Sequence, residues 1–168
     1  MLLKTHVVGG LIAGEILVKA MSNSDFGLSP QPLFTTFACL FLSVIGSILP
    51  DIDLHNSTAG NKIAPASWLI QLFVGHRTFF HSPFFVCLSY FALVSFFPYA
   101  QPLILACCVG MASHIILDSL NKAGIPLLWP LPIRFWAIGI KAGSIMERSL
   151  GLGLAGLSII MMLLIILE

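Results

Sequence analysis

Two stretches of 19 residues that carry no charged side chain, 32–50 and 149–167, most constrain what this chain can fold into. A helix of about 20 apolar residues spans the hydrocarbon core of a bilayer, so each stretch has the length of one membrane span. Residues 82–113 also lack charge, and prolines at positions 98 and 102 divide this segment because proline interrupts a helix. Only 9% of the 168 residues are charged, whereas soluble domains carry about 25%. The chain is therefore predicted to be an integral membrane protein.

The apolar pattern predicts an all-α fold, a polytopic membrane helical bundle of about five spans in a single domain, 1–168. The expected spans lie near 5–21, 32–50, 82–97, 100–120 and 149–167. Residues 66–75 are too short for a span and are expected to form a re-entrant or interfacial segment. Residues 124–140 contain three prolines, two tryptophans and one arginine, a mixture that suits the headgroup level of the membrane. Glu15 would interrupt the apolar core of a signal peptide, so a retained first helix is expected.

The basic residues predict how the spans are oriented. Seven of the eight fall in the N-terminal segment and in the 51–81 and 121–148 loops, which the span order puts on one side of the membrane. They are Lys4, Lys62, Arg77, Lys122, Arg134, Lys141 and Arg148. By the positive-inside rule this side, and with it the N-terminus, faces the cytoplasm. The net charge of +1 and the lack of a basic stripe argue against a nucleic-acid partner.

Histidines and aspartates from four separate segments are predicted to meet at the same membrane face. His114 and Asp118 are four residues apart and therefore share one face of a helix. The candidate metal ligands are His6, Asp51, Asp53, His76, His81, His114 and Asp118. Chance clustering is the alternative, because polar residues collect at the ends of spans in any membrane protein. Chance does not explain why these residue types avoid the opposite face, and ionisable residues near spans are usually functional, so we prefer a metal site.

The ligand types indicate which metal such a site would hold. Imidazole and carboxylate without thiolate suit zinc, manganese, iron or magnesium, of which zinc is the preferred candidate. Seven ligands exceed the four of one tetrahedral zinc, so the set leaves room for two ions. A pair of metal ions activates water and neutralises charge on a phosphoryl or carbonyl oxygen, which predicts hydrolysis. The four cysteines lie in apolar segments without a CxxC pair and are interpreted as small buried hydrophobic residues.

Several of the charged residues have two interpretations. Asp51 and Asp53 follow Pro50 and could cap a helix, but beside histidines either could be a ligand or the base that takes a proton. Arg77 could bind a substrate phosphate or only anchor to lipid headgroups. Glu15 is either a partner for Lys19, four residues further on, or a buried functional acid, and the partner is preferred.

Four segments together resemble one known family: KTH (4–6), LPDID (49–53), GHRTFFHS (75–82) and HIILDSLNKAGIPLLWPLP (114–132). The chain is similar to the YdjM-like family of bacterial inner-membrane proteins, which are taken to be metal-dependent hydrolases and are linked by regulation to the SOS repressor LexA. The resemblance covers nearly the whole chain up to Pro132. It implies a location in the bacterial inner membrane and the same seven metal ligands.

The leading hypothesis is an enzyme, a membrane-embedded metal-dependent hydrolase whose site lies at the cytoplasmic interface. A site at this level meets lipid headgroups, so the expected substrate is a phosphoester of a membrane lipid or of a lipid-linked molecule. Metal-activated water would attack phosphorus, Asp51 or Asp53 would take the proton, and Arg77 would stabilise the developing charge. An ion or metal transporter is a second hypothesis, but it predicts ligands near the midplane. A third is a non-catalytic protein in which metal staples helix ends together.

Overall fold

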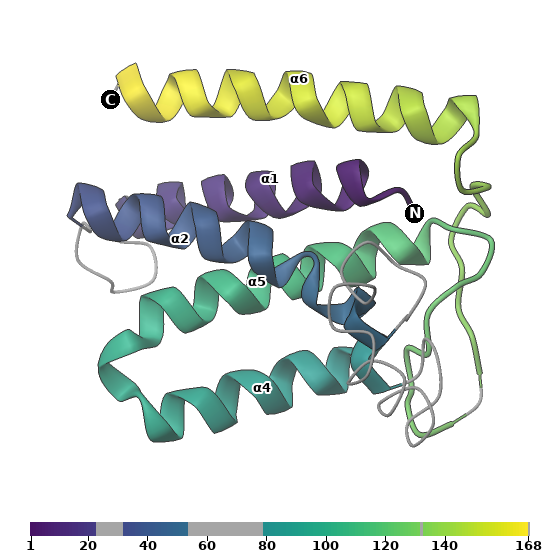
Figure 1. Cartoon of the computed structure of the whole chain (residues 1–168), viewed down its shortest axis with the longest axis horizontal. Helices are drawn as coiled ribbons and strands as arrows, with labels where there is room; N and C mark the ends of the chain where they lie inside the picture. The colour runs from purple at the N-terminus through teal and green to yellow at the C-terminus, as the bar shows by residue number, and fades with distance from the viewer. Residues whose placement is uncertain (23–31, 54–78, 132, 168) are drawn as a thin grey trace.

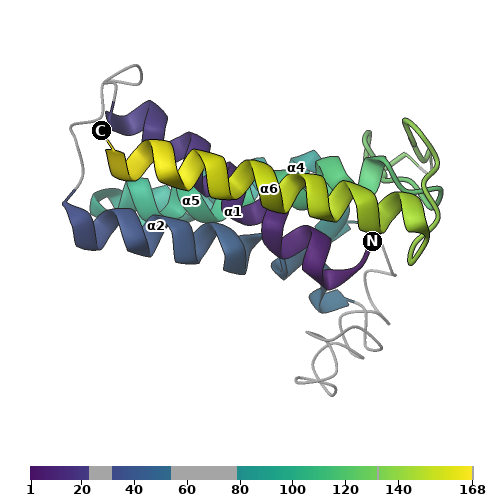
Figure 2. The ribbon, with the colours of Figure 1, turned by 90° about the horizontal axis from the view of Figure 1, so that it is seen from above.

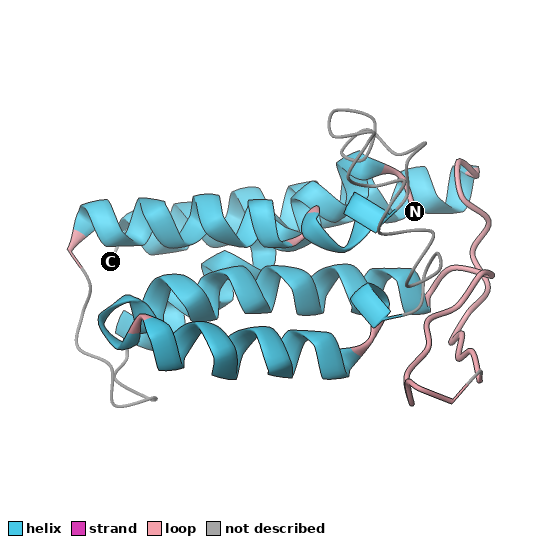
Figure 3. Cartoon of the chain, turned by 60° about the horizontal axis from the view of Figure 1, so that its bottom comes forward, coloured by secondary structure: helices cyan, strands magenta, loops and turns pink. Residues whose placement is uncertain are grey.

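The structure, a computed structural model, describes residues 1–22, 32–53, 79–131 and 133–167. Across these residues the chain forms helices and turns, and it has no strand beyond two isolated bridges (Figure 3). The α-helices are α1 (Leu3–Ser22), α2 (Leu33–Gly46), α4 (Pro83–Phe96), α5 (Gln101–Ser119) and α6 (Ile145–Leu167). Short 3₁₀ helices connect them, namely η1 (Leu49–Asp53), η3 (Phe79–His81) and η4 (Pro98–Ala100). The predicted all-helical bundle is confirmed.

The helices that are long and apolar enough to cross a membrane coincide with the charge-free stretches. In the described part of the chain they are Leu33–Asp51, Pro98–Ser119 and Ile145–Leu167. α4 is apolar but has only 14 residues, whereas α1 has 20 residues that include two lysines and a glutamate. The composition of the helices therefore makes this a membrane protein. A crossing of the membrane by α1 and α4 stays a prediction.

The last helix begins at Ile145, four residues before the expected start at 149. The amide of Glu147 donates to Oγ of Ser144 at 3.3 Å, so Ser144 caps the helix. Ser-x-x-Glu is the capping-box pattern that marks a helix start. The uncharged run begins later than the helix because the first turn carries Glu147 and Arg148.

Small residues let α1, α2 and α5 approach one another closely. Gly14 of α1 lies against Ser43 of α2, and Gly10 lies against Ser47, which directly follows α2. A Cβ on either glycine would overlap the serine that it faces. A Cβ on Gly110 of α5 would overlap the backbone carbonyl of Ser43. Small residues four positions apart commonly allow such close contact between membrane helices. The backbone of α2 is thereby fixed against both α1 and α5.

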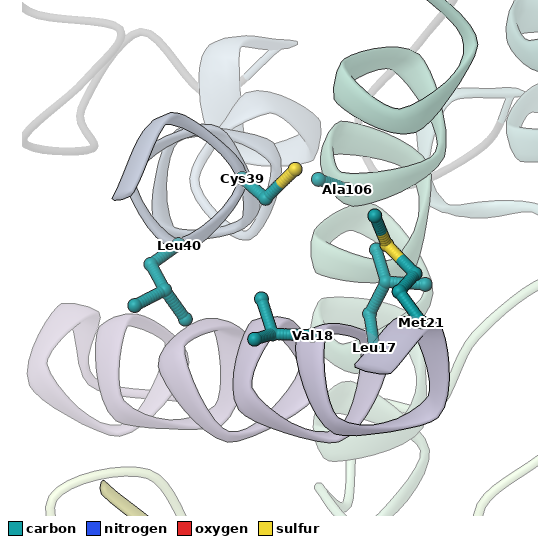
Figure 4. Packing of buried hydrophobic residues seen from close by; sticks show 6 residues of the cluster. All are labelled: Leu17, Val18, Met21, Cys39, Leu40 and Ala106. Atoms are coloured by element: carbon teal, nitrogen blue, oxygen red, sulfur yellow. The ribbon is translucent and has the colours of Figure 1, made fainter. Parts of the chain in front are cut away.

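The bundle has its core where α1, α2 and α5 meet. Figure 4 shows the six buried residues of this core: Leu17, Val18, Met21, Cys39, Leu40 and Ala106. α6 packs along α1, and α4 packs along α5 on the opposite side of the bundle (Figure 1). α1 and α6 run in the same direction and begin at the same end of the bundle, as the two views show (Figure 2). The last turn of α5 lies at that end too (Figure 1).

The segment between α5 and α6 forms no span, as its prolines predict. Isolated bridges pair Asn121 with Ile140 and Ile125 with Phe135, so the chain returns on itself at this end of the bundle. Trp136 is 57% exposed, in keeping with a tryptophan at the membrane surface. The expected interfacial segment 66–75 lies outside the described residues.

Candidate metal site

Five of the seven predicted metal ligands lie together at the end of the bundle where α1 begins and α5 ends. His6 belongs to the first turns of α1, Asp51 to η1 and His81 to the last position of η3. His114 and Asp118 lie one turn apart near the end of α5. Segments that are far apart in the sequence thus supply the cluster formed by His6, Asp51, His81, His114 and Asp118.

The donor atoms of this cluster are close to one another. Nε2 of His6 lies 3.4 Å from Oδ1 of Asp118. Nε2 of His81 lies 3.6 Å from Oδ1 of Asp51 and 3.8 Å from Oδ2 of Asp118. Nε2 of His114 lies 3.7 Å and 3.8 Å from the same two oxygens. Each carboxylate therefore faces more than one imidazole.

Four of the five side chains are completely shielded from solvent. The side chains of His6, His81, His114 and Asp118 are 0–1% exposed, whereas that of Asp51 is 15% exposed. Burying an ionised carboxylate is costly unless it is paired or coordinates a metal. Asp51 is the member of the cluster that can be reached from outside.

The tautomer of His114 follows from its surroundings. Its Nδ1 lies 2.7 Å from the backbone carbonyl oxygen of Ser47, and a carbonyl can only accept a hydrogen bond. Nδ1 therefore carries a proton, so the lone pair of the neutral ring is on Nε2, which faces Asp51 and Asp118. Metal-binding histidines usually show this arrangement, in which one ring nitrogen donates to a carbonyl and the other binds the metal.

His6 lies directly against His114. The two rings are stacked with centroids 3.8 Å apart and planes inclined by 14°. Within the described part of the chain, neither ring nitrogen of His6 has a hydrogen-bond partner, and neither does Nε2 of His114. Buried polar atoms normally have a partner, so nitrogens of this kind are expected where an ion or ligand binds.

The spacing of the donors fits a bound metal ion. Donors in a tetrahedral zinc site lie at about 2.0–2.1 Å from the metal, which separates neighbouring donors by about 3.3–3.4 Å. The nitrogen–oxygen distances in the cluster, 3.4 to 3.8 Å, are close to this separation. Those of 3.6 Å and more are too long for hydrogen bonds. The donor set of imidazole and carboxylate oxygen suits zinc and harder divalent ions.

The cluster contains two groups of three donors, each group lying within 4.8 Å: His6, Asp51 and His114, and His81, His114 and Asp118. His114 belongs to both, and its Nδ1 is already engaged by Ser47. Its one remaining nitrogen can bind one ion. The described side chains therefore suit one ion, and a second would need donors from elsewhere.

The structure describes no side chain for the other predicted site residues, Asp53, His76 and Arg77. Asp53 ends η1, and nothing is described of its side chain. His76 and Arg77 lie in the 54–78 segment, outside the described residues. Glu15 lies within α1 and accepts a hydrogen bond at 2.8 Å from Ser158 of α6. This contact joins α1 to α6. The expected partner of Glu15 was Lys19, which lies on the same helix as Glu15.

Two contacts that the sequence did not predict hold the start of the chain at the cluster. The amino group of Met1 lies 2.9 Å from Oδ1 of Asp118. Glu147, which is fully buried, accepts hydrogen bonds at 2.5 Å from the backbone amides of Leu2 and Gly143. Glu147 thus ties the first turn of α6 to the segment that leads into His6. The Ser-x-x-Glu pattern at 144–147 is the sequence signal that could have drawn attention to Glu147. The hydrogen bond between His114 and the Ser47 carbonyl has no such signal in the sequence.

Comparison with known proteins gives two matches over nearly the whole chain and one over about half of it. The family described as YdjM inner membrane protein matches residues 1–167. An uncharacterized protein of Bacillus subtilis (strain 168), YvsG, is 32% identical over 157 residues, which are 93% of this chain and 89% of YvsG. The inner membrane protein YdjM of Escherichia coli (strain K12) is 36% identical over 101 residues, which are 55% of this chain and 50% of that protein. No solved structure matches the chain.

Proposed function

The chain belongs to the YdjM inner membrane protein family, and from this premise we propose that it is a membrane-embedded, metal-dependent hydrolase. The observation that supports the proposal is the buried cluster of three histidines and two aspartates, with donors spaced as ligands of one ion. We expect zinc, with manganese, iron or magnesium as alternatives. We also expect the cluster and the N-terminus to face the cytoplasm.

The residues of the cluster have different tasks in this proposal. His6, His81, His114 and Asp118 are the buried members and would hold the ion, which when bound would polarise a substrate oxygen and activate water. The Ser47 carbonyl keeps the lone pair of His114 directed into the cluster. Asp51 is partly exposed and close to His81 and His114, so it is placed to accept a proton at its Oδ1. Asp53 is proposed as the alternative base and His76 as a further metal ligand. Arg77 is proposed to bind the phosphate of the substrate.

The proposed substrate is a phosphoester of a membrane lipid or lipid-linked molecule. The cluster lies at the ends of apolar helices, at the level where a span gives way to loops. A substrate that stays in the membrane would meet such a site with its headgroup. Soluble phosphoesters lack the apolar part that would hold them at this surface.

Hydrolysis is tested with purified protein in liposomes that contain a defined mixture of phospholipids. Phosphate and headgroup release are measured with zinc or manganese, after treatment with a chelator, and with the variant Asp51→Asn. The proposal expects turnover that needs the metal and falls at least 100-fold in Asp51→Asn, because a proton acceptor contributes about 10²–10⁴-fold. Metal-loaded protein that releases nothing from any phosphoester lipid would contradict it.

A non-catalytic metal staple is the second candidate, and the burial of the cluster favours it. Four of the five side chains are 0–1% exposed, so little of the site is open to a substrate. A staple predicts that metal binding raises the thermal stability and that neither wild type nor Asp51→Asn shows turnover. The liposome assay therefore separates the two candidates.

A further inference from the structure

A groove about 400 Å³ in volume is lined by residues from the first turns of α1 and α6. Both helices begin at the same end of the bundle (Figure 2). Leu2 and Val8 form one wall, and Gly151 and Ala155 lie on the other. The groove stays open because the residues on its α6 side are small. A Cβ on Gly151 would lie 3.4 Å from Oγ1 of Thr5, across the groove on α1. This α1–α6 groove is an apolar channel of the size that commonly holds one ligand.

Two cations, Lys4 and Arg148, also line the groove. Each lies in the first turns of its helix, and each is exposed. Neither forms an ion pair with a carboxylate in the described ranges 1–22, 32–53, 79–131 and 133–167. The adjacent Glu147 forms no salt bridge with Lys4 or Arg148, because its buried carboxylate accepts hydrogen bonds from the backbone amides of Leu2 and Gly143.

The positive charge of the groove comes from these two side chains. The N-terminal end of a helix carries a partial positive charge, but at the starts of α1 and α6 the carboxylate of Glu147 already accepts hydrogen bonds from the amides of Leu2 and Gly143. The groove thus combines an apolar channel with two exposed cations. Its chemistry is complementary to a molecule that has both an apolar chain and an anionic group.

We propose that the α1–α6 groove binds one anionic phospholipid, with its phosphate at Lys4 and Arg148 and an acyl chain along Val8, Gly151 and Ala155. The membrane supplies this ligand, because α6 is a membrane-spanning helix that is exposed along most of its length. Basic pockets between membrane helices commonly bind such headgroups. A second copy of the chain fits less well, since packing groove against groove would bring four unpaired cations together.

The site is separate from the metal cluster in its chemistry, and the proposal does not depend on hydrolysis. A bound lipid would nevertheless act on the cluster, because it would connect α6 to the turn of α1 that holds Thr5 and the adjacent His6. A ligand that binds the folded state stabilises it. The lipid would therefore stabilise the end of the bundle at which the cluster lies.

Native mass spectrometry of the detergent-purified protein tests the proposal. Phosphatidylglycerol and phosphatidylcholine with the same acyl chains are added separately to wild type, to Lys4→Gln/Arg148→Gln, and to Lys122→Gln/Lys141→Gln. The control pair removes the same charge from two exposed lysines of the loop before α6. We expect one phosphatidylglycerol on wild type and on the control, and on the order of 30-fold weaker binding in the groove variant, since each basic residue near an anionic lipid contributes about fivefold.

Equal binding of the two lipids, or equal losses in the two paired variants, would overturn the proposal. A second pair of variants tests the channel itself: Gly151→Leu fills the groove, whereas a Cβ on Gly153 meets nothing within 4 Å. Folded Gly151→Leu should lose the lipid and Gly153→Leu should keep it. Retention of the lipid by Gly151→Leu, or a dimer of wild type in place of the lipid adduct, would show that the groove has another role.

Discussion

Gly110 is predicted to be a position at which a single added methyl group damages both the fold and the candidate metal site. In Gly110→Ala the new Cβ would overlap the backbone carbonyl of Ser43, which cannot rotate away as a side chain could. α5 must then move from α2 by at least about 1 Å to remove the overlap. Overpacking of this kind costs about 1–3 kcal/mol, and a backbone clash belongs at the upper end of that range.

The same movement reaches the metal cluster. His114 lies one turn beyond Gly110 on α5, and its Nδ1 is 2.7 Å from the carbonyl of Ser47, the residue that directly follows α2. Separation by about 1 Å would lengthen this distance to about 3.7 Å, beyond hydrogen-bond range. Loss of a contact that orients a metal ligand typically weakens metal binding about 10–100-fold.

The assay is thermal unfolding in detergent, with metal affinity measured by titration on the same samples. A cost of about 2–3 kcal/mol corresponds to a decrease in Tm of about 4–12 °C in a chain of this size. Gly156→Ala is the matched control, because a Cβ at Gly156 on α6 meets nothing within 4 Å. Unchanged Tm and metal affinity in Gly110→Ala, or equal changes in both variants, would refute the packing of α2 against α5 described here.

Three further predictions concern the buried acids and the metal. Glu147→Ala should lower the free energy of unfolding by about 2 kcal/mol, because the amides of Leu2 and Gly143 lose their acceptor, and denaturant unfolding would measure the loss. Glu15→Ala should cost about 1 kcal/mol through the lost hydrogen bond from Ser158, whereas Glu15→Gln, which keeps an acceptor, should cost less; equal costs would show that this bond contributes nothing. Removal of the metal by a chelator should lower Tm by about 5–11 °C, relative to protein in free metal at about 100 times its dissociation constant. Added zinc should restore the Tm.

The helices could be predicted from the sequence because their signal is a long run without charge. The five expected spans coincide with the α-helices of the described residues, and the family resemblance is confirmed by a match over residues 1–167. α6 contains the whole span expected near 149–167 and begins four residues earlier, since Glu147 and Arg148 lie in its first turn. Charged residues determine where the uncharged run begins, whereas the helix begins where the amide of Glu147 bonds to Oγ of Ser144.

The convergence of the site residues could be expected from span order, but its geometry could not. Alternation of the chain across the membrane put His6, Asp51, His81 and His114 at one end of the bundle without giving any distance. The stacking of His6 on His114 depends on how closely α1, α2 and α5 approach, and glycines set that approach. The Ser47 contact is made by a backbone carbonyl, an atom that every residue has, so no residue type could reveal it.

The metal content of the purified protein is the most direct test of the central claim, that the buried cluster binds a divalent ion. Elemental mass spectrometry would be applied to wild type, to His114→Asn and to Glu15→Gln after equilibration with zinc, with Glu15→Gln as a control for changing a buried acid outside the cluster. The predicted result is about one ion or more in wild type and Glu15→Gln, and less than about a tenth of that in His114→Asn. Wild type without metal, or His114→Asn with as much metal as wild type, would contradict the claim.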